Sequence, residues 1–335
     1  MVKRWLLLPI MAALLAVTML PDHGLSQAAD RVTLQLKWVT QAQFAGYYAA
    51  RAKDLYTAEK LDVTIRPGGP DIVPEQVVAG GGAQFGIDWL PSLLSARDQG
   101  APLVNIAQVF AYSGMRELAF KSSGIKGGAD LKGRRVAVWF GGNEFELLAT
   151  LEKYKIDRNK DVTLIQQPFD MNLLLQKKVD AAAAMTYNEY KQVMDAGVKP
   201  DELVVIDFNK EGTAMLEDGI FVKADWIRDA KNKQLAARFL RASLRGWALC
   251  KDRPAECVEI VLKESPVLGR EHQTWMMTEI NKLIWGPPAP ASPLGKTDPA
   301  AFKQTADIAL KFGVIKKPAG DGAFTHEIWE LAQKK

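Results

Sequence analysis

The chain has 335 residues and a formal net charge of +4 at pH 7, with 48% hydrophobic and 24% charged residues. This length is sufficient for two globular lobes with buried cores. The positive excess is small and is spread over the chain without a long basic run, so we expect no nucleic-acid partner.

The amino terminus has the pattern of a secretory signal peptide. Two basic residues precede the apolar run Trp5–Leu20, and Ser26-Gln27-Ala28 then places small residues where signal peptidase cuts. We expect cleavage after Ala28, so that residues 1–28 form the signal peptide of an exported protein. No cysteine lies near this point, so no lipid anchor is expected, and no later apolar run reaches the roughly 18–20 residues that span a bilayer.

The chain from residue 29 to residue 118 alternates between strand and helix patterns. Short apolar runs predict strands, and runs with a period near 3.6 predict helices. Such alternation is typical of a mostly parallel sheet with helices on both faces, and we expect this part to begin a first lobe. The predicted strands are Val32–Trp38, Leu61–Arg66, Phe85–Ile87 and Leu103–Val109, and the predicted helices are Phe44–Lys53, Ile72–Ala79 and Leu90–Asp98.

A second alternating series follows, and we expect residues 119–217 to form a second lobe. Its segment Ala181–Met185 is poor strand material by propensity, but Asp180 before it and Thr186-Tyr187-Asn188 after it have the order expected of a strand that leads into a helix. The series begins after Leu118–Lys121. Its other predicted strands are Val136–Trp139, Val162–Ile165 and Leu203–Asp207, and its predicted helices are one that begins near Asn143, then Met171–Lys177 and Tyr187–Ala196.

The last third of the chain has the pattern of long amphipathic helices. No further series of strands is predicted after Ala224. In the simplest architecture residues 218–335 return to pack on the first lobe, so the chain would cross between the lobes near Ala119 and again near Gly219–Val222. The predicted helices are Lys231–Lys251, Pro254–Lys263, Arg270–Trp285 and Pro299–Phe312.

The two cysteines, Cys250 and Cys257, lie on either side of Pro254. On one continuous helix their Cα atoms would be ~10 Å apart, beyond the reach of a disulfide. Proline breaks a helix, however, and would let two helix ends fold towards each other. Because the protein is expected to be exported, we favour a Cys250–Cys257 disulfide over a pair of buried small apolar residues.

A pair of glycines, Gly141 and Gly142, lies where a predicted strand leads into a predicted helix. Glycines permit a sharp turn and a close approach of the backbone to a ligand. Asn143 and Glu146 have the spacing of a capping box, which would leave Glu144 free to meet a ligand. Carboxylates in the first turn offset the positive end of the helix dipole, so this corner favours a neutral or amino-bearing ring over a small oxyanion. An ordinary capped turn with a solvated Glu144 would have the same sequence.

Residues for familiar enzyme chemistry are scarce. Beyond residue 28 the only histidines are His272 and His326, both in the predicted helical region and far from the strand ends. No HExxH, CxxC or GxSxG sequence is present. We therefore expect no catalytic residue, no metal ion and no cofactor, although Asp and Glu are too common for the sequence to exclude a carboxylate-based hydrolase.

Aromatic residues instead gather with amide and acidic residues at four predicted strand ends, the edge of an open α/β sheet where ligands bind. Aromatic faces can stack on a ring while amide and carboxylate groups pair with its edge, so the pattern suits a flat, hydrogen-bonding ligand. Each tryptophan alone would more often belong to a core. The groups are Trp38 with Gln41 and Gln43, Asp88 with Trp89, Trp139 with Asn143 and Glu144, and Tyr187 with Asn188 and Tyr190.

The chain contains, in this order, the segments LQLKWVTQAQFAGYYAARAKDLY, GGGAQFGID, DLKGRRVAVWFGGNEFEL and VDAAAAMTYNEY. Together they resemble the substrate-binding proteins of ABC importers in the group named after the yeast thiamine-pyrimidine synthase. KWVTQAQFAGYY and GGNEFEL resemble the branch that binds pyrimidine precursors of thiamine or, in relatives, riboflavin. The resemblance covers about Arg31–Val261.

This resemblance implies a type II periplasmic-binding-protein fold: two α/β lobes joined by two crossovers, with a helical carboxyl-terminal part on the first lobe. The lobes would close on the ligand in the periplasm, and the protein, expected to be a monomer, would deliver that ligand to a membrane permease and its ATPase. Positions that match the family's pocket are Trp38, Gln43, Asp88, Trp89, Gly141, Gly142, Asn143 and Glu144, then Tyr187 and Asn188, with Glu217 and Asp218 where the family also lines its cleft.

Two departures from the family pattern bear on the chemistry. The yeast-type enzymes carry a histidine in the first corner and a cysteine-rich run near the return crossover, where this chain has Gln43-Phe44 and Leu216–Gly219. Many thiamine-precursor binders have an asparagine-rich first corner, which Thr40–Gln43 replaces here. We therefore predict a binding protein for a thiamine-pyrimidine-like or riboflavin-like ring; the alternatives are a binder of alkanesulfonate, taurine or nitrate and, less favoured, a pyrimidine-synthase-like enzyme.

Overall fold

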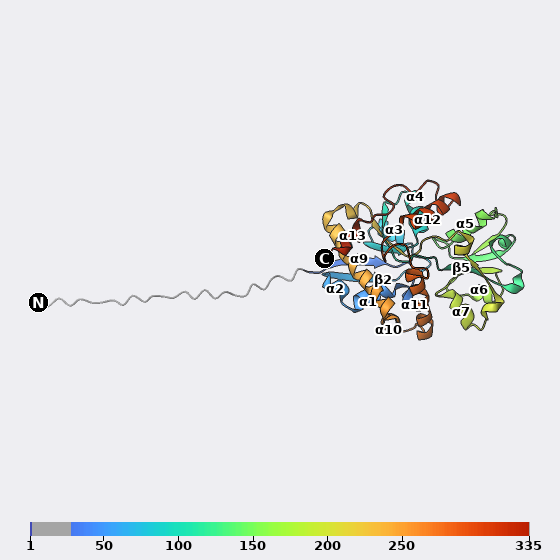
Figure 1. The fold of residues 1–335 in the computed structure, drawn as a ribbon, viewed down its shortest axis with the longest axis horizontal. Coiled ribbons are helices and arrows are strands. Elements are labelled where there is room, and N and C mark those ends of the chain that lie inside the picture. Colours follow the sequence, from blue (N-terminus) through green and yellow to red (C-terminus); the bar gives the residue numbers. More distant parts are fainter. Residues whose placement is uncertain (2–27, 335) are drawn as a thin grey trace.

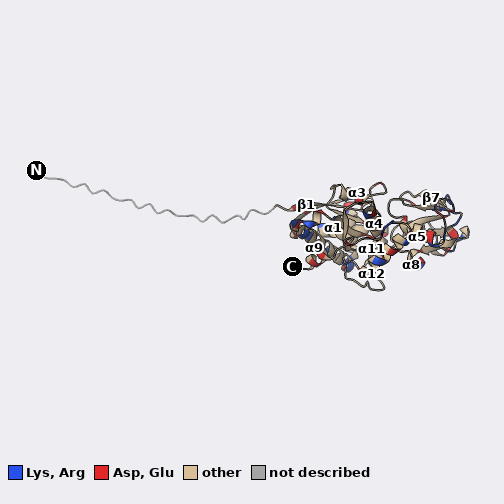
Figure 2. Ribbon diagram, turned by 90° about the horizontal axis from the view of Figure 1, so that it is seen from above, with Lys and Arg blue, Asp and Glu red and all other residues tan. Residues whose placement is uncertain are grey.

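The computed structural model describes Met1 and residues 28–334, which form two lobes side by side (Figure 1). The predicted signal peptide therefore lies almost entirely outside the described residues. Within residues 28–334 no helix is both long and apolar enough to cross a membrane. Basic and acidic residues both occur along each of the two lobes (Figure 2).

The first lobe is built on a five-stranded sheet with the order β2-β1-β3-β10-β4. Strands β1 (Asp30–Gln35), β2 (Leu61–Arg66) and β3 (Phe85–Asp88) run parallel, as predicted. Strand β10 (Gly219–Lys223) lies between β3 and β4 (Leu103–Gln108) and is antiparallel to both. The two edge strands differ in burial: every residue of β4 is buried, whereas β2 alternates between buried and exposed residues, so that one of its faces meets solvent.

The second lobe has a five-stranded sheet with the order β7-β6-β8-β5-β9. The alanine-rich strand β8 (Ala181–Met185) has the predicted bounds and is buried along its whole length. It is parallel to β6 and antiparallel to β5, which also pairs with β9. The other strands are β5 (Met115–Phe120), β6 (Arg135–Val138), β7 (Thr163–Gln166) and β9 (Leu203–Asp207).

The first crossover comes earlier than expected. All of β5 pairs within the second sheet, so the expected boundary at residue 118 falls inside a strand of the second lobe. The chain crosses between β4 and β5, in residues 109–114, and returns between α8 and β10, in residues 212–218. A strand that follows a crossover pairs with partners distant in sequence, which local patterns do not reveal.

Helices cover both sheets, and the long carboxyl-terminal helices pack mainly on the first lobe (Figure 1). The short ones are α2 (Leu55–Ala58), α6 (Asn172–Leu175) and α8 (Phe208–Glu211). The others are α1 (Ala45–Ala52), α3 (Pro74–Ala79), α4 (Leu90–Asp98), α5 (Phe145–Lys153), α7 (Glu189–Asp195), α9 (Ala230–Asp252), α10 (Pro254–Glu264), α11 (Arg270–Trp285), α12 (Pro299–Lys311) and α13 (Glu327–Gln333).

Helices α1 and α9 approach each other closely at two glycines. A Cβ atom on Gly246 would lie 2.0 Å from the carbonyl oxygen of Gly46, so the contact requires the absence of a side chain. Beside it, the rings of Tyr47 and Trp247 meet edge to face with centroids 5.6 Å apart. This packing fixes α9, and with it the carboxyl-terminal helices, against the corner that follows β1.

The structure joins Cys250 to Cys257 by a disulfide between the end of α9 and the start of α10. Helix α9 ends at Asp252 and α10 begins at Pro254, so the proline separates two helices in the way the sequence indicates. The two Cα atoms lie 5.4 Å apart. Both cysteines are fully buried.

Candidate functional site

A small cavity lies between the lobes, at the ends of strands from both sheets. Its volume is about 20 Å³, enough for one water molecule but not for an aromatic ring. Any ring that binds here must therefore separate the residues that now meet across the cleft. The first lobe contributes Lys37, Trp38, Gln41, Gln43 and Trp89, and the second contributes Trp139, Asn143, Met185, Tyr187 and Asn188.

The structure thus brings together six of the twelve ligand-binding residues expected from the sequence. The other six do not line this cavity. Gln41 and Trp139, which belong to the aromatic and polar groups noted at the predicted strand ends, also line it, and so do Lys37 and Met185, which the sequence did not single out. The six that line it are Trp38, Gln43, Trp89, Asn143, Tyr187 and Asn188, and the six that do not are Asp88, Gly141, Gly142, Glu144, Glu217 and Asp218.

Aromatic rings from the two lobes meet over the cavity. The rings of Trp38 and Trp139 are edge to face with centroids 6.1 Å apart, and Phe169 of the second lobe lies 5.0 Å from Trp38. The Trp139 indole N–H donates to the carbonyl oxygen of Pro168 (3.0 Å), which fixes this ring to its own lobe. The contact between lobes is therefore made by ring faces and edges, the groups that also stack on flat ligands.

A buried ion pair lies beneath the aromatic rings. Lys37 Nζ donates to Asp88 Oδ1 at 2.5 Å, and the two side chains are 8% and 1% exposed. Burial lowers the pKa of Lys37, but the charge and hydrogen bond of Asp88 outweigh it, so that this pKa lies above its ordinary value. The lysine also lies over the Trp89 ring, 5.1 Å from its centroid. A charged residue at the end of an apolar strand was the sequence feature that could have identified Lys37.

A chain of amide hydrogen bonds runs from the cavity to the return crossover. Gln41 Nε2 donates to Gln43 Oε1 (2.8 Å), and Gln43 Nε2 donates to Asp218 Oδ2 (2.9 Å). Asp218 is 2% exposed, and burial raises the pKa of its carboxyl to about 7. Its backbone φ of 49° is left-handed, a conformation that aspartate tolerates better than most residues. Asp218 does not line the cavity, but it accepts a hydrogen bond that holds the amide group of Gln43 in place.

Glu217 points away from the cavity and towards the first crossover. Its Oε1 accepts hydrogen bonds from Ser113 Oγ (2.7 Å) and from the backbone N–H groups of Gly114 (2.9 Å) and Met115 (3.1 Å). The side chain is fully buried. It therefore joins the two crossovers, which connect the lobes.

The predicted capping box of Asn143 and Glu146 is wrong. Helix α5 has Glu144 at its N-cap position without a side-chain capping bond, and Glu144 Oε2 instead accepts from the N–H of Gly142 (2.8 Å). Glu146 is buried, and its Oε1 accepts from the N–H of Met215 in the return crossover (2.6 Å). The expectation that Glu146 caps the helix and leaves Glu144 free to meet a ligand therefore fails, because Glu144 closes its own loop and Glu146 binds the return crossover.

Glu146 and Glu217 share one hydroxyl group. Glu146 Oε2 lies 3.0 Å from Ser113 Oγ, which also contacts Glu217. A serine has one proton to donate, so one of the two carboxyls must carry a proton for both contacts to be hydrogen bonds. Burial raises the pKa of Glu217 to about 8; burial and then the charge of Glu217 raise the pKa of Glu146 well above its usual range.

Replacing Glu217 with glutamine should reduce the dependence of stability on pH. A carboxyl whose pKa rises from 4.5 to about 8 on folding binds its proton more tightly in the folded state. Its contribution to stability is therefore complete below pH 4.5 and is lost as the pH rises through 8. Urea unfolding at several pH values in this window should show a steeper fall for the wild type than for Glu217→Gln. The control is Glu330→Gln, an exposed carboxyl of α13; equal slopes for the wild type and Glu217→Gln would contradict the assignment.

The turn between β6 and α5, which contains Gly141 and Gly142, lies against the first lobe. Gly142 is buried, and a Cβ atom on it would lie 2.3 Å from Ser92 Oγ of α4. Gly141 is exposed, with nothing near the corresponding position. Both have positive φ angles, 97° for Gly141 and 139° for Gly142. The close approach predicted for this corner is thus made to the opposite lobe.

His272 lies closer to the site than the sequence indicated. The helical region was expected to lie far from the strand ends, yet His272 Nε2 is 2.7 Å from Asn188 Oδ1. His326 does lie elsewhere, with Nε2 2.8 Å from the carbonyl oxygen of Thr297. Within residues 28–334 no cluster of three or more His, Cys, Asp or Glu residues is arranged to hold a metal ion.

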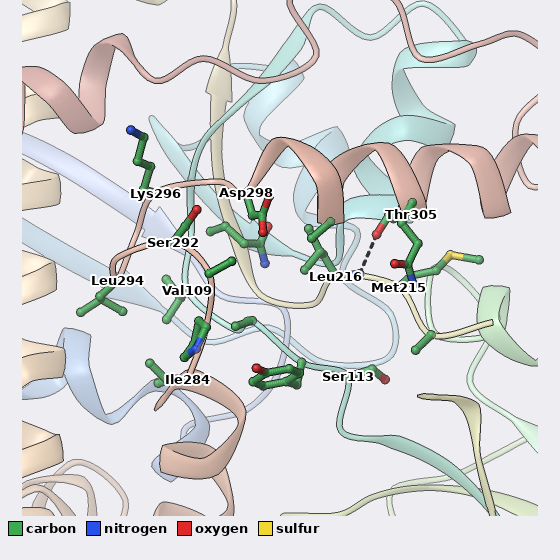
Figure 3. Close-up of a pocket in the computed structure, with 18 of the residues that line it drawn as sticks. Val109, Ser113, Met215, Leu216, Ile284, Ser292, Leu294, Lys296, Asp298 and Thr305 are labelled. Atoms are coloured by element: carbon green, nitrogen blue, oxygen red, sulfur yellow. Dashed lines mark hydrogen bonds between the residues drawn. The ribbon is translucent and has the colours of Figure 1, made fainter. Parts of the chain in front are cut away.

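A larger cavity of about 300 Å³ lies beside the crossovers (Figure 3). It is bounded by residues 108–113 and 214–216, by the proline-rich loop after α11 and by α12. The N–H of Leu216 donates to Thr305 Oγ1 (3.1 Å) at its edge. None of the expected ligand-binding residues lines it.

Comparison with known proteins places the chain in a family. The family described as NMT1/THI5 like matches residues 41–257. The riboflavin-binding protein RibY from Chloroflexus aurantiacus is 27% identical over 322 residues, which cover 93% of this chain and 90% of RibY. The 4-amino-5-hydroxymethyl-2-methylpyrimidine phosphate synthase from Legionella pneumophila is 26% identical over 266 residues, covering 73% of this chain and 77% of the synthase.

Solved structures show the same fold at lower identity. The alkanesulfonate-binding protein SsuA from Xanthomonas axonopodis pv. citri, bound to MOPS, has a TM-score of 0.65 and 18% identity, over 89% of this chain and 99% of SsuA. The expected type II periplasmic-binding-protein fold, with two α/β lobes, is therefore confirmed. Because the family match spans more than half of its residues, this chain belongs to the NMT1/THI5-like family.

Proposed function

We propose that this protein is the solute-binding component of an ABC importer and that it captures a flat heteroaromatic ligand by closure of its two lobes. The ligand class is a riboflavin-like ring or a thiamine pyrimidine precursor. The observation that carries the proposal is the meeting of Trp38 and Trp139 from opposite lobes, directly over a cavity lined by amide side chains. A ring that enters between them would exchange an aromatic contact between lobes for two aromatic contacts with ligand.

The polar residues of the cavity favour a ligand whose edge is uncharged and forms hydrogen bonds. Gln41, Gln43, Asn143 and Asn188 supply both donors and acceptors, as the edge of a pyrimidine or flavin requires. Among the ten described residues that line the cavity, Lys37 is the one cation, and on its own it would favour a sulfonate or nitrate. Its charge is already offset by Asp88 at 2.5 Å, which argues against that alternative.

A binding role is favoured over catalysis. The ten residues that line the cavity include no histidine or cysteine, and Lys37 is held in an ion pair. The similarity to a protein named as a synthase leaves turnover as the outcome that would contradict this part of the proposal. We further propose that residues 1–28 direct export to the periplasm, and that the protein acts there as a monomer with a membrane permease and its ATPase.

Removing the Trp38 ring should weaken ligand binding. Purified, dialysed protein is titrated with riboflavin, with 4-amino-5-hydroxymethyl-2-methylpyrimidine, with taurine and with nitrate by calorimetry. We expect one of the two ring compounds to bind with one-to-one stoichiometry, and Trp38→Ala to weaken its binding by roughly tenfold. Tyr154→Ala, a change at an exposed aromatic residue of the second lobe, should leave binding unchanged. Binding of taurine or nitrate but of neither ring would overturn the ligand class.

A further inference from the structure

Helix α11 stands at the boundary between the two lobes, beyond the end of the family match (Figure 1). It packs against α10 and against the turn Ala42–Phe44, both on the first lobe. Towards its other end, the carbonyl oxygen of Leu283 accepts from the N–H of Ala111 in the first crossover (2.9 Å). Helix α11 therefore packs on the first lobe and extends from the cleft to the first crossover.

Neighbouring residues of α11 bind the cavity corners of both lobes. On the first lobe, Gln273 Oε1 accepts from the N–H of Ala42 (2.7 Å), the residue between Gln41 and Gln43. On the second lobe, His272 Nε2 lies 2.7 Å from Asn188 Oδ1, and the indole N–H of Trp275 donates to the carbonyl oxygen of Thr186 (3.0 Å). Gln273 is 2% exposed, so its bond is shielded from water.

The hydrogen bonds of Asn188 determine its orientation and the tautomer of His272. Asn188 Nδ2 donates to Glu189 Oε1 (2.6 Å), which turns Oδ1 towards His272. His272 must then donate from Nε2, because Oδ1 can only accept. Oδ1 also lies 3.3 Å from Gln192 Nε2, so both of its acceptor positions are used. The second hydrogen on Nδ2 is the polar group that Asn188 has left to offer to the cavity.

The charged neighbours of His272 do not disturb this arrangement. Its Nδ1 faces Asp195 Oδ2 of α7 at 3.8 Å. Lys191, also in α7, pairs with Asp195 and with Glu271 of α11. Burial, followed by the charge of Lys191, lowers the pKa of His272, and Asp195 only partly opposes this. Nε2–H is a donor in both the neutral and the protonated ring, so the contact with Asn188 persists in either state.

We propose that His272 is a positioning residue that fixes Asn188 as a hydrogen-bond donor to the ligand, and that α11 acts as a brace joining the two binding corners when the cleft is closed. This inference rests on the proposed function, because it concerns the same cavity. It adds one element of ligand chemistry: the part of the ring that meets Asn188 carries an acceptor, such as a ring carbonyl or an unprotonated ring nitrogen.

Two substitutions separate the hydrogen bond from the bulk of the side chain. His272→Phe keeps a flat ring and removes the donor, whereas His272→Gln keeps a donor. His326→Phe is the matched control, because His326 contacts a backbone carbonyl oxygen away from the cleft. We expect His272→Phe to raise the dissociation constant for riboflavin, measured by flavin fluorescence, by roughly tenfold, with His272→Gln close to wild type and His326→Phe unchanged.

Two further readouts report positioning. The preference for a pyrimidinone over an aminopyrimidine of the same size should fall in His272→Phe, because the Asn188 amide is then oriented by Glu189 and Gln192 alone and presents its oxygen to the cavity more often. Hydrogen exchange of the backbone around residues 183–190, measured without ligand, should become faster in the same variant. The proposal is overturned if His272→Phe matches the wild type in all three measurements, or if His272→Gln is as impaired as His272→Phe.

The same experiments separate this inference from the proposed function. If the wild type binds neither flavin nor pyrimidine, the proposed function fails, and the exchange measurement alone decides whether His272 holds the Asn188 corner. If the wild type binds a ring and the variants behave alike, the function stands and the brace is wrong. Circular dichroism of each variant shows whether the fold is retained.

Discussion

Replacing Gly142 with alanine should weaken ligand binding by about 10- to 100-fold while both lobes remain folded. The added methyl group would lie 2.3 Å from Ser92 Oγ and 3.4 Å from Lys37 Nζ, both on the opposite lobe. It must therefore displace Ser92 or hold the lobes apart, and either change acts on the closed cleft. Titration with the ligand identified for the wild type measures the loss, and urea unfolding checks that stability is little changed.

Gly141→Ala is the matched control for this prediction. Gly141 also has a positive φ, 97°, so alanine imposes a similar backbone strain there, but nothing lies within 4 Å of its Cβ position. Ser92→Ala combined with Gly142→Ala should recover part of the affinity, because it removes the oxygen that the methyl group meets. If the Gly141 and Gly142 variants lose affinity equally, strain in the loop and not contact between the lobes is the cause.

Replacing Lys37 with methionine should lower the free energy of unfolding by about 3–5 kcal/mol. The change leaves the Asp88 carboxylate, 1% exposed, without its partner inside the protein. Because the pKa of Lys37 lies above its ordinary 10.5, the ion pair is present in full at neutral pH and is lost only as the pH rises through that raised value. Urea unfolding near pH 7 is therefore the appropriate measurement.

Two further variants test the cause of this loss. Asp88→Asn in the Lys37→Met background removes the uncompensated charge and keeps an acceptor for the N–H of Trp89, so it should recover part of the stability. Lys303→Met breaks a pair with Asp307 whose side chains are 76% and 62% exposed, and should cost less than ~1 kcal/mol. A loss for Lys37→Met no larger than that for Lys303→Met would show that the buried pair adds nothing.

Much of the fold followed from local sequence patterns. The bounds of Leu61–Arg66, Ala181–Met185 and Arg270–Trp285 agree with the structure, because each is limited by residues that start or stop an element locally. The antiparallel strands β5 and β10 were not predicted as such. Their direction depends on pairing across the crossovers, which neither periodicity nor composition records.

The candidate site was predicted best where side chains follow directly from strand ends, as with Trp38 and Trp89. It was predicted worst where a partner comes from a distant segment. Glu146 fits a capping box by spacing, but Ser113 and Met215 reach it through tertiary packing. His272 is near the cavity only because of where α11 packs. Spacing along the sequence can suggest a local hydrogen bond, such as a helix cap, but it does not show which distant segment packs against a residue.

The order of the strands also constrains how the chain can fold. All five strands of the second sheet lie between residues 115 and 207, so this lobe is continuous in sequence. Its contacts can therefore form without any residue that follows this stretch. The first sheet needs β10, whose residues 219–223 separate β3 from β4, before these strands are joined. Because closing so long a loop is slow, we expect the second lobe to fold first and the first lobe to finish around the returning chain.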